Sequence, residues 1–251
     1  MADQRTGRVI LASMAALSQA IEELYLVFGS YRVGKHVTGC PCCTSPEEEQ
    51  QLVARPLRSL TGDDLGSYAM SALYTWGSER DFKHFLPRIL QLLVQGTIWV
   101  DVQSVYAKLP YARWDQWPAL EQSTIQRFTL AWFADLLGRS SRVQPEDLLE
   151  CAGMVGCDLA DYIALWEAEK SPVATTYLAQ LVIHRSEHLA RATLPWSWWQ
   201  NDTLRTVPRW LLSGRATALL ATAFAREVDH PDAGDWALAH DILEALSLNP
   251  D

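Results

Sequence analysis

Apolar residues recur at helical spacing along most of this 251-residue chain, and no stretch alternates convincingly between apolar and polar residues as a half-buried β-strand does. The clearest run begins near the N-terminus, where successive apolar positions are separated by four and three residues and therefore share one face of a helix. These positions are Ile10, Met14, Leu17, Ile21, Leu24 and Phe28. We predict a first helix that buries Ile10, Leu17 and Leu24 and stops at Gly29.

Further helix starts carry a local signal, a proline at the first helical position followed in the best cases by acidic residues that favour the positive end of the helix dipole. The examples are Ser45-Pro46, Gln144-Pro145, Trp117-Pro118 and Ser171-Pro172. Thr61 and Ser78 each precede an aspartate by three residues, a variant of the capping box that predicts helices starting near 62 and 79. Pro87 is expected to break or kink the second of these helices.

The rest of the chain is also compatible with helices. The segments are 99–108, 118–137, 146–155, 157–169, 172–193, 203–228 and 234–247, and Gln95–Asp101 is the one ambiguous run. Roughly ten helices with short connections predict an all-α fold, an irregular multi-helix array. No linker rich in Pro, Gly or Ser divides the chain and no fixed repeat is present, so we expect residues 1–251 to form a single helical domain.

The net charge of the chain indicates the kind of partner it can bind, and its cysteine content indicates its cellular compartment. The formal net charge is −9, from 21 Lys+Arg and 30 Asp+Glu, whereas a dedicated nucleic-acid binder needs a surplus of basic side chains. No apolar run approaches the ~20 residues that cross a bilayer, and the N-terminus lacks the pattern of a signal peptide. Five cysteines, with Cys42 and Cys43 adjacent, do not resemble a secreted disulfide framework. We expect a cytoplasmic protein with neither a nucleic-acid nor a membrane partner.

The cysteines at 40–43 form the most conspicuous local motif. Cys40 and Cys43 have the two-residue gap that lets two thiolates bind one zinc ion, and His36 or His84 could supply a further ligand. No second cysteine pair has structural-zinc spacing. The favoured interpretation is a tight turn whose thiols pack against the first helix as small hydrophobes and hold it against the segment around His84. Metal binding and redox chemistry are the alternatives, and we expect no cofactor.

A second candidate metal motif is His184-Arg-Ser-Glu-His188, which matches the H-x-x-E-H pattern of inverzincins. Its histidines, four residues apart, share one helix face and could bind zinc beside a carboxylate base. Glu227 is the nearest downstream candidate for the third ligand that such an enzyme needs. A polar helix face gives the same pattern, and we favour that interpretation.

Two further features are compositional. Of the eleven tryptophans, Trp196, Trp198, Trp199 and Trp210 lie in the arginine-rich stretch 185–226, where core packing is the favoured interpretation and partner contact the alternative.

Residues 144–169 carry seven acids and neither Lys nor Arg. Those acids are Glu146, Asp147, Glu150, Asp158, Asp161, Glu167 and Glu169. We expect them to form a partner-binding surface.

One part of the chain resembles a block found in uncharacterised bacterial all-helical proteins. The resemblance rests on CPCC-x-SP at 40–46 and DFKHFLPR at 81–88, with Pro56–Leu60, Tyr68 and Thr75–Gly77 between them, and it covers about residues 36–93. It implies a bacterial cytoplasmic protein in which the cysteine turn and Phe82–Leu90 belong to one structural unit. It assigns no activity.

No P-loop, dinucleotide-binding glycine motif, nucleophile elbow or kinase motif is present in the sequence. Two classes of function remain. We expect a non-enzymatic immunity or inhibitor protein that neutralises a basic bacterial toxin or effector by surface contact, because an acidic protein captures a basic partner rapidly. The alternative is a zinc-binding protein or metal-dependent hydrolase that uses Cys40/Cys43 or His184/His188.

Overall fold

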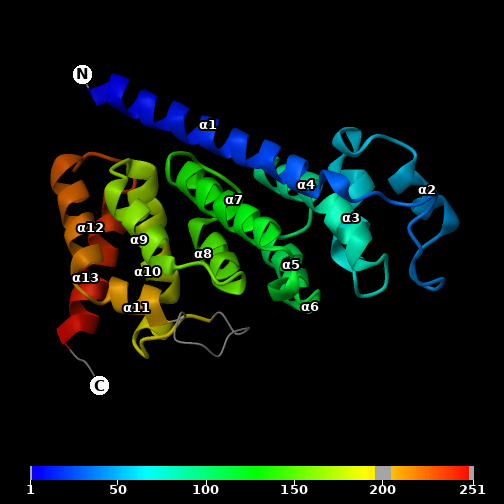
Figure 1. Cartoon of the computed structure of the whole chain (residues 1–251). Helices are drawn as coiled ribbons and strands as arrows, with labels where there is room; N and C mark the ends of the chain where they lie inside the picture. The colour runs from blue at the N-terminus through cyan, green and yellow to red at the C-terminus, as the bar shows by residue number, and fades with distance from the viewer. Residues whose placement is uncertain (1, 196–204, 249–251) are drawn as a thin grey trace. The chain divides into compact units, whose positions relative to one another are not determined.

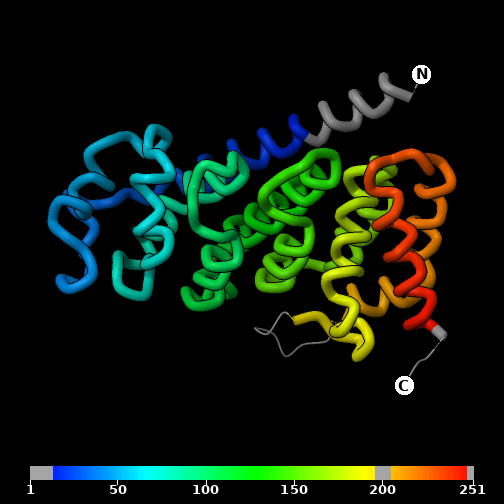
Figure 2. The backbone as a smooth tube through the Cα atoms, turned by 180° about the vertical axis from the view of Figure 1, so that it is seen from behind, coloured from blue at the N-terminus to red at the C-terminus, as the bar shows by residue number. Residues whose placement is uncertain are grey.

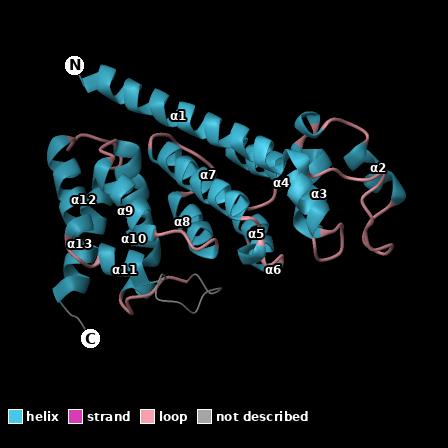
Figure 3. Cartoon of the chain, viewed as in Figure 1, coloured by secondary structure: helices cyan, strands magenta, loops and turns pink. Residues whose placement is uncertain are grey.

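The computed structural model describes residues 2–195 and 205–248, with side chains described for 14–195 and 205–247. Over these residues the chain is helical and contains no β-strand, as Figure 3 shows by its cyan ribbons. Two isolated bridges, between Gly39 and Trp76 and between Ala72 and Trp76, are the nearest approach to a sheet in the described part. The all-α prediction is confirmed.

The chain divides into two compact units. The N-terminal unit is Ala12–Trp132, and the C-terminal unit is Phe133–Asp251 together with Met1–Leu11. Whether the two unfold as the single domain that the sequence predicts stays a prediction, and each unit is described by itself below.

The N-terminal unit is built on α1 and on helices that begin with local caps. Its elements are most of α1 (Ala2–Val27), η1 (Phe28–Ser30), α2 (Pro46–Val53), η2 (Leu57–Ser59), α3 (Gly62–Ser71), α4 (Glu79–Gln95), α5 (Val102–Tyr106), α6 (Lys108–Tyr111), η3 (Trp114–Gln116) and most of α7 (Ala119–Leu137) (Figure 1). Ser45, Thr61 and Ser78 each close a capping box with the acid three residues on, which confirms these three predicted starts.

The apolar stripe of α1 is buried where it meets the rest of the N-terminal unit. Leu17 and Leu24 are buried as predicted and Phe28 is buried as well, whereas Met14 is exposed. The side chain of Ile10 lies outside the described residues.

Of the two effects expected of Pro87, the break does not occur, since α4 runs continuously from Glu79 to Gln95, and the kink stays a prediction. A proline removes one backbone hydrogen bond and crowds the preceding turn. Here Phe82, Phe85, Leu86, Ile89 and Leu90 are all buried on this helix, and their packing outweighs that loss. Tertiary burial has overridden the local signal.

A buried ion cluster joins α4, α7 and Tyr31, the residue just after η1. The Lys83 ammonium lies 3.1 Å from a Glu121 carboxylate oxygen and 3.0 Å from one of Glu79. Tyr31 donates a hydrogen bond of 2.5 Å to Glu121, and Lys83 also lies 4.0 Å from the centre of the Trp117 ring. Lys83 and Glu121 are both buried, so their charges depend on each other and on these neighbours.

The C-terminal unit is a helical bundle. Its helices are α8 (Pro145–Met154), α9 (Leu159–Ala168), α10 (Pro172–Leu189), α11 (Thr206–Leu211), α12 (Arg215–Arg226) and α13 (Ala233–Leu248). Helix α10 packs against α12 and α13, which lie side by side, as Figure 2 shows from behind. The predicted segment 203–228 is divided at Gly214, whose φ of 79° ends any continuous helix there.

None of the helices in the described part has both the length and the apolar character that crossing a bilayer requires.

Candidate functional site

The seven acids of 144–169 do not form one free surface, because most of them have structural roles within the C-terminal unit. Asp147, Asp158 and Glu169 accept hydrogen bonds from backbone N–H groups of Gln144, Ala160 and Ser171, at or just before helix N-termini. Their charges therefore stabilise the fold.

Two of the acids are paired with arginines of the stretch 185–226. Glu146 lies 2.6 Å from Arg185, and Glu167 pairs with Arg215 and accepts a hydrogen bond of 2.8 Å from the Trp210 indole. The arginine-rich stretch therefore neutralises part of the acidic one. Of the seven acids, only Asp158 and Asp161 are exposed, and Glu150 is half-buried with an interaction of its own.

The H-x-x-E-H motif lies near the end of α10, where His184 and Glu187 are exposed. Within the described residues neither His184 nor His188 belongs to a group of three metal-ligating side chains. Glu227, the candidate third ligand, pairs instead with Arg226. The exposed part of this motif is therefore a polar helix face.

The cysteine turn, residues 39–44 of the N-terminal unit, has a backbone held by several hydrogen bonds. The Cys40 N–H donates to Thr75 O at 2.7 Å, and the Cys40 carbonyl accepts from the N–H groups of Cys43 and Thr44. A Cβ at Gly39 would lie 2.2 Å from the Thr44 hydroxyl, so only glycine allows the turn to close this tightly. The backbone of the turn is therefore held from within and from the segment near Trp76.

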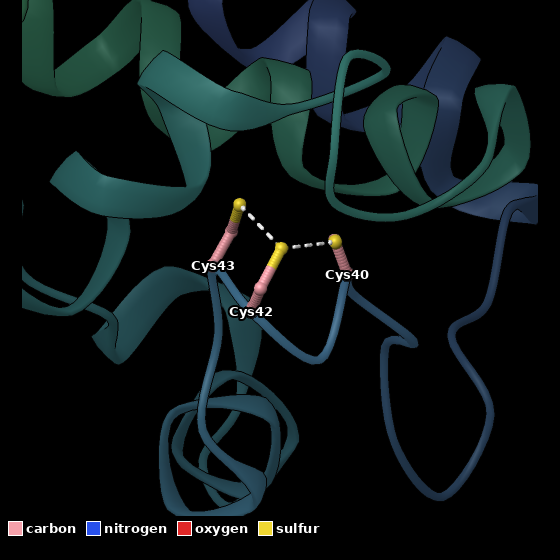
Figure 4. A group of neighbouring side chains, drawn as sticks. All are labelled: Cys40, Cys42 and Cys43. Atoms are coloured by element: carbon pink, nitrogen blue, oxygen red, sulfur yellow. Dashed lines mark hydrogen bonds between the residues drawn. The ribbon is translucent and has the colours of Figure 1, made fainter.

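The three thiols of this turn converge instead of packing into the core (Figure 4). The Sγ atoms of Cys40 and Cys42 are 2.9 Å apart, and those of Cys42 and Cys43 are 3.6 Å apart. Cys42 and Cys43 are exposed and Cys40 is half-buried, so the prediction of buried thiols against the first helix is wrong. Within this turn Thr44 is the buried residue, with its hydroxyl donating to the Cys40 carbonyl, while the thiols of Cys42 and Cys43 reach solvent.

Hydrogen bonding among these thiols changes their acidity. The bond from the Cys42 thiol lowers the pKa of Cys40, because it stabilises the thiolate. The same bond raises the pKa of Cys42 to about 11. Neither His36 nor His84 belongs to this group of ligands: His36 is exposed, and the His84 ring lies 3.0 Å from the Tyr31 carbonyl.

A surface that the sequence did not single out lies along α3. A Cβ at Gly66 would lie 2.0 Å from Nε1 of Trp99, so the indole rests directly on the helix backbone. Met70 follows on the same face of α3 one turn later, and Tyr74 comes just after the helix. Tyr74 and Tyr111 pack edge to face with ring centres 4.9 Å apart. We call Met70, Tyr74, Trp99 and Tyr111 the aromatic surface.

The aromatic surface is open to solvent. Exposed fractions are 53% for Trp99, 51% for Tyr74 and 59% for Tyr111. By contrast, Trp76, Trp114, Trp117, Trp132, Trp166, Trp210 and Trp236 are all buried. Core packing, the favoured interpretation for the tryptophans of 185–226, is thus confirmed for Trp210. Trp196, Trp198 and Trp199 lie outside the described residues.

Backbone strain flanks the aromatic surface. Leu73, immediately before Tyr74, has φ 70°, and Arg113, two residues after Tyr111, has φ 49°. Non-glycine residues in this left-handed region cost about 1–3 kcal/mol each, and such strain concentrates at functional sites. The strain at Leu73 therefore accompanies a loop that holds Tyr74 in an exposed position.

Lys108 contacts the ring of Tyr74, one of the residues of the aromatic surface. Its ammonium lies 4.8 Å from the centre of the Tyr74 ring and donates to the Ser104 carbonyl at 3.0 Å, while the residue as a whole is buried. Burial lowers the pKa of Lys108 from its ordinary 10.5 to about 8, against the opposing attraction of Asp101.

This shift predicts a pH dependence of stability. Between pH 8 and 10.5 the unfolded chain holds the Lys108 proton more tightly than the folded chain does, so the free energy of unfolding rises with pH across this window. The measurement is urea denaturation of the wild type and of Lys108→Met at several pH values. Because tyrosines titrate in the same range, the difference between the two proteins is the relevant quantity. A difference that does not change with pH would show that Lys108 keeps its ordinary pKa.

One other group of metal-ligating residues is present in the described part, His240, Asp241 and Glu244 on α13. His240 lies 3.2 Å from Asp241 and 3.8 Å from Glu244, and both carboxylates are exposed. These distances describe side-chain contacts along one helix face, which need no metal to explain them.

Comparison with known proteins leaves the site to be interpreted from its own chemistry. No family model, curated protein or solved structure matches this chain.

Proposed function

We propose that this chain is a non-enzymatic protein-binding protein whose partner docks on the aromatic surface. The observations that carry the proposal are the exposed Trp99, whose indole rests on Gly66 of α3, and the exposed ring pair of Tyr74 and Tyr111. Tryptophan and tyrosine are the residues in which binding energy concentrates at protein interfaces, and methionine adapts to the shape of a partner. Their local contacts hold these rings in place before binding, which reduces the entropy lost on association.

Charge around the aromatic surface favours a basic partner. Asp63 shares the α3 face of Gly66 and Met70 and is exposed, and Asp101 is exposed two residues after Trp99. The chain as a whole carries a formal charge of −9. An apolar centre with acidic neighbours complements a protein whose contact surface has apolar residues ringed by Lys and Arg.

Within this class, the proposed partner is a basic toxin or effector that the chain neutralises by covering its surface. The chain would act in the bacterial cytoplasm, with its cysteines reduced. Asp158 and Asp161, the exposed acids of 144–169, would add to the attraction at long range. The gene next to that of this chain is the first place to look for the partner, since immunity proteins are normally encoded beside their toxins.

The experiment is co-purification with the product of the adjacent gene, followed by measurement of Kd. Trp99→Ala and Tyr111→Ala are each expected to weaken binding by about 2 kcal/mol, roughly thirtyfold in Kd, as at other interface hot spots. Leu26→Ala is the matched control, because Leu26 is a 79% exposed apolar residue of the same unit outside the aromatic surface. Its Kd should equal that of the wild type.

Circular dichroism of each variant checks that the helices are retained. Equal Kd values for Trp99→Ala, Tyr111→Ala and Leu26→Ala would remove the aromatic surface as the docking site. Complete absence of binding to the adjacent product would count against the immunity function.

A further inference from the structure

We propose that Cys40, Cys42 and Cys43 bind one Zn²⁺ ion through three thiolates, with the fourth coordination position open to a ligand from outside the chain. The three Sγ atoms lie within 4.8 Å of one another on a single turn. This site is separate from the aromatic surface, and the proposal does not rest on the protein partner.

The separations between the sulfur atoms suit zinc. Three sulfurs bound to tetrahedral Zn²⁺ at about 2.3 Å lie about 3.8 Å apart. The Cys42–Cys43 distance of 3.6 Å is close to that value, whereas the sulfurs of Cys40 and Cys42, 2.9 Å apart, have to separate by about 0.9 Å, a change on the scale of a small side-chain rotation. Thiolates are also the ligands that select zinc over magnesium or calcium.

The hydrogen-bonded backbone of the turn holds the three cysteines in place before an ion binds. The backbone of the turn is fixed by the hydrogen bond from Cys40 to Thr75 and by the Cys43 N–H on the Cys40 carbonyl. Gly39 donates its N–H to Glu49 at 2.8 Å, which ties the same turn to α2. An ion therefore meets three thiols already on one side of a fixed turn, as Figure 4 shows.

The exposure of the thiols and the number of protein ligands both indicate that the fourth coordination position of the ion is open. Cys42 and Cys43 are exposed, so an ion can enter from solvent. No fourth His, Cys, Asp or Glu of the described residues joins the group. Closed structural zinc sites use four protein ligands, whereas sites with three protein ligands hold water or a further ligand in the fourth position.

The test is titration of the full chain, reduced with a phosphine and freed of metal, with Co²⁺ as a coloured substitute for Zn²⁺. We expect one equivalent to bind with sulfur-to-cobalt charge-transfer bands and the strong visible bands of tetrahedral cobalt, and one equivalent of Zn²⁺ to displace it. Cys40→Ser, Cys42→Ser and Cys43→Ser should each weaken binding at least tenfold. Cys157→Ala is the control and should bind like the wild type, because Cys157 does not belong to the group.

A small thiol added to the cobalt complex tests the open position. We expect the visible bands to shift as the thiol becomes the fourth ligand, and an unchanged spectrum would contradict an open position. The proposal of a zinc site is overturned if the triple variant Cys40→Ser/Cys42→Ser/Cys43→Ser, folded by circular dichroism, takes up as much cobalt as the wild type. These substitutions lie on an exposed turn, so loss of colour in a folded variant reports on the ligands themselves.

Discussion

Glu121→Ala is expected to destabilise the N-terminal unit by about 3 kcal/mol, because it removes the buried partner of a buried cation. Lys83 is almost fully enclosed and lies 3.1 Å from Glu121, and the pKa of Lys83 is nevertheless raised because hydrogen bonds to Glu79 and Glu121 outweigh burial. Without Glu121, only the half-exposed Glu79 remains to balance the charge. Tyr31 also loses the acceptor of its hydroxyl.

The control is Glu23→Ala, which removes a carboxylate from another ion pair of the same unit. Glu23 lies 2.6 Å from Arg127, and both side chains are substantially exposed. Such surface pairs contribute about 0–1 kcal/mol, so this variant should stay close to the wild type. Urea denaturation followed by circular dichroism gives both values. Equal effects of the two substitutions would show that the Lys83 cluster is not a buried ion pair in solution.

Trp236→Ala is expected to destabilise the C-terminal unit by about 3–5 kcal/mol, the cost of deleting a large aromatic side chain from a core. Trp236 has no exposed surface on α13, and its ring stacks on His230 with centres 4.6 Å apart. Its indole N–H donates to the Thr176 hydroxyl on α10 at 3.1 Å, so the substitution leaves a cavity where α10 and α13 pack.

Leu238→Ala is the matched control for Trp236→Ala, because it removes a 48% exposed apolar side chain from the same helix. It should change the midpoint of thermal unfolding only slightly. A Trp236→Ala midpoint equal to that of Leu238→Ala would contradict the packing of α13 described above.

Glu121→Ala and Trp236→Ala together test the single-domain prediction, because each lies in a different unit. If the chain is one cooperative domain, each variant shifts the only unfolding transition. Two transitions, one moved by each substitution, would show that the units unfold independently.

The features that the sequence predicted correctly are local ones. The starts at Ser45, Thr61 and Ser78 depend on a side chain and a backbone N–H three residues apart, so their information lies within one turn. The burial of Leu17 and Leu24 follows from helical spacing in the same way. Pro87 shows the limit of such reasoning, since its effect was decided by side chains packed around α4.

The candidate sites depended on contacts between distant residues. The backbone N–H of Cys40 is hydrogen-bonded to Thr75, 35 positions along the chain. Glu146 and Glu167 are paired with Arg185 and Arg215, which are 39 and 48 residues away in the sequence. Their charges are therefore balanced within the fold. Trp99 is exposed between the buried Ile98 and Val100, whereas Trp76 is buried, and the residue type alone does not predict this difference. Composition indicated the kinds of residue that matter, and only the fold showed which of them reach solvent.

Hydrogen–deuterium exchange of the chain, free and bound to the product of the adjacent gene, tests the central claim most directly. Docking on the aromatic surface should slow exchange of backbone amides in the connections around it, 72–76, 97–101 and 111–113. Exchange in 144–169 should change little, because most of its acids already serve the fold. Protection confined to 144–169, with none at 72–76, 97–101 or 111–113, would contradict the account and place the partner on the acidic stretch.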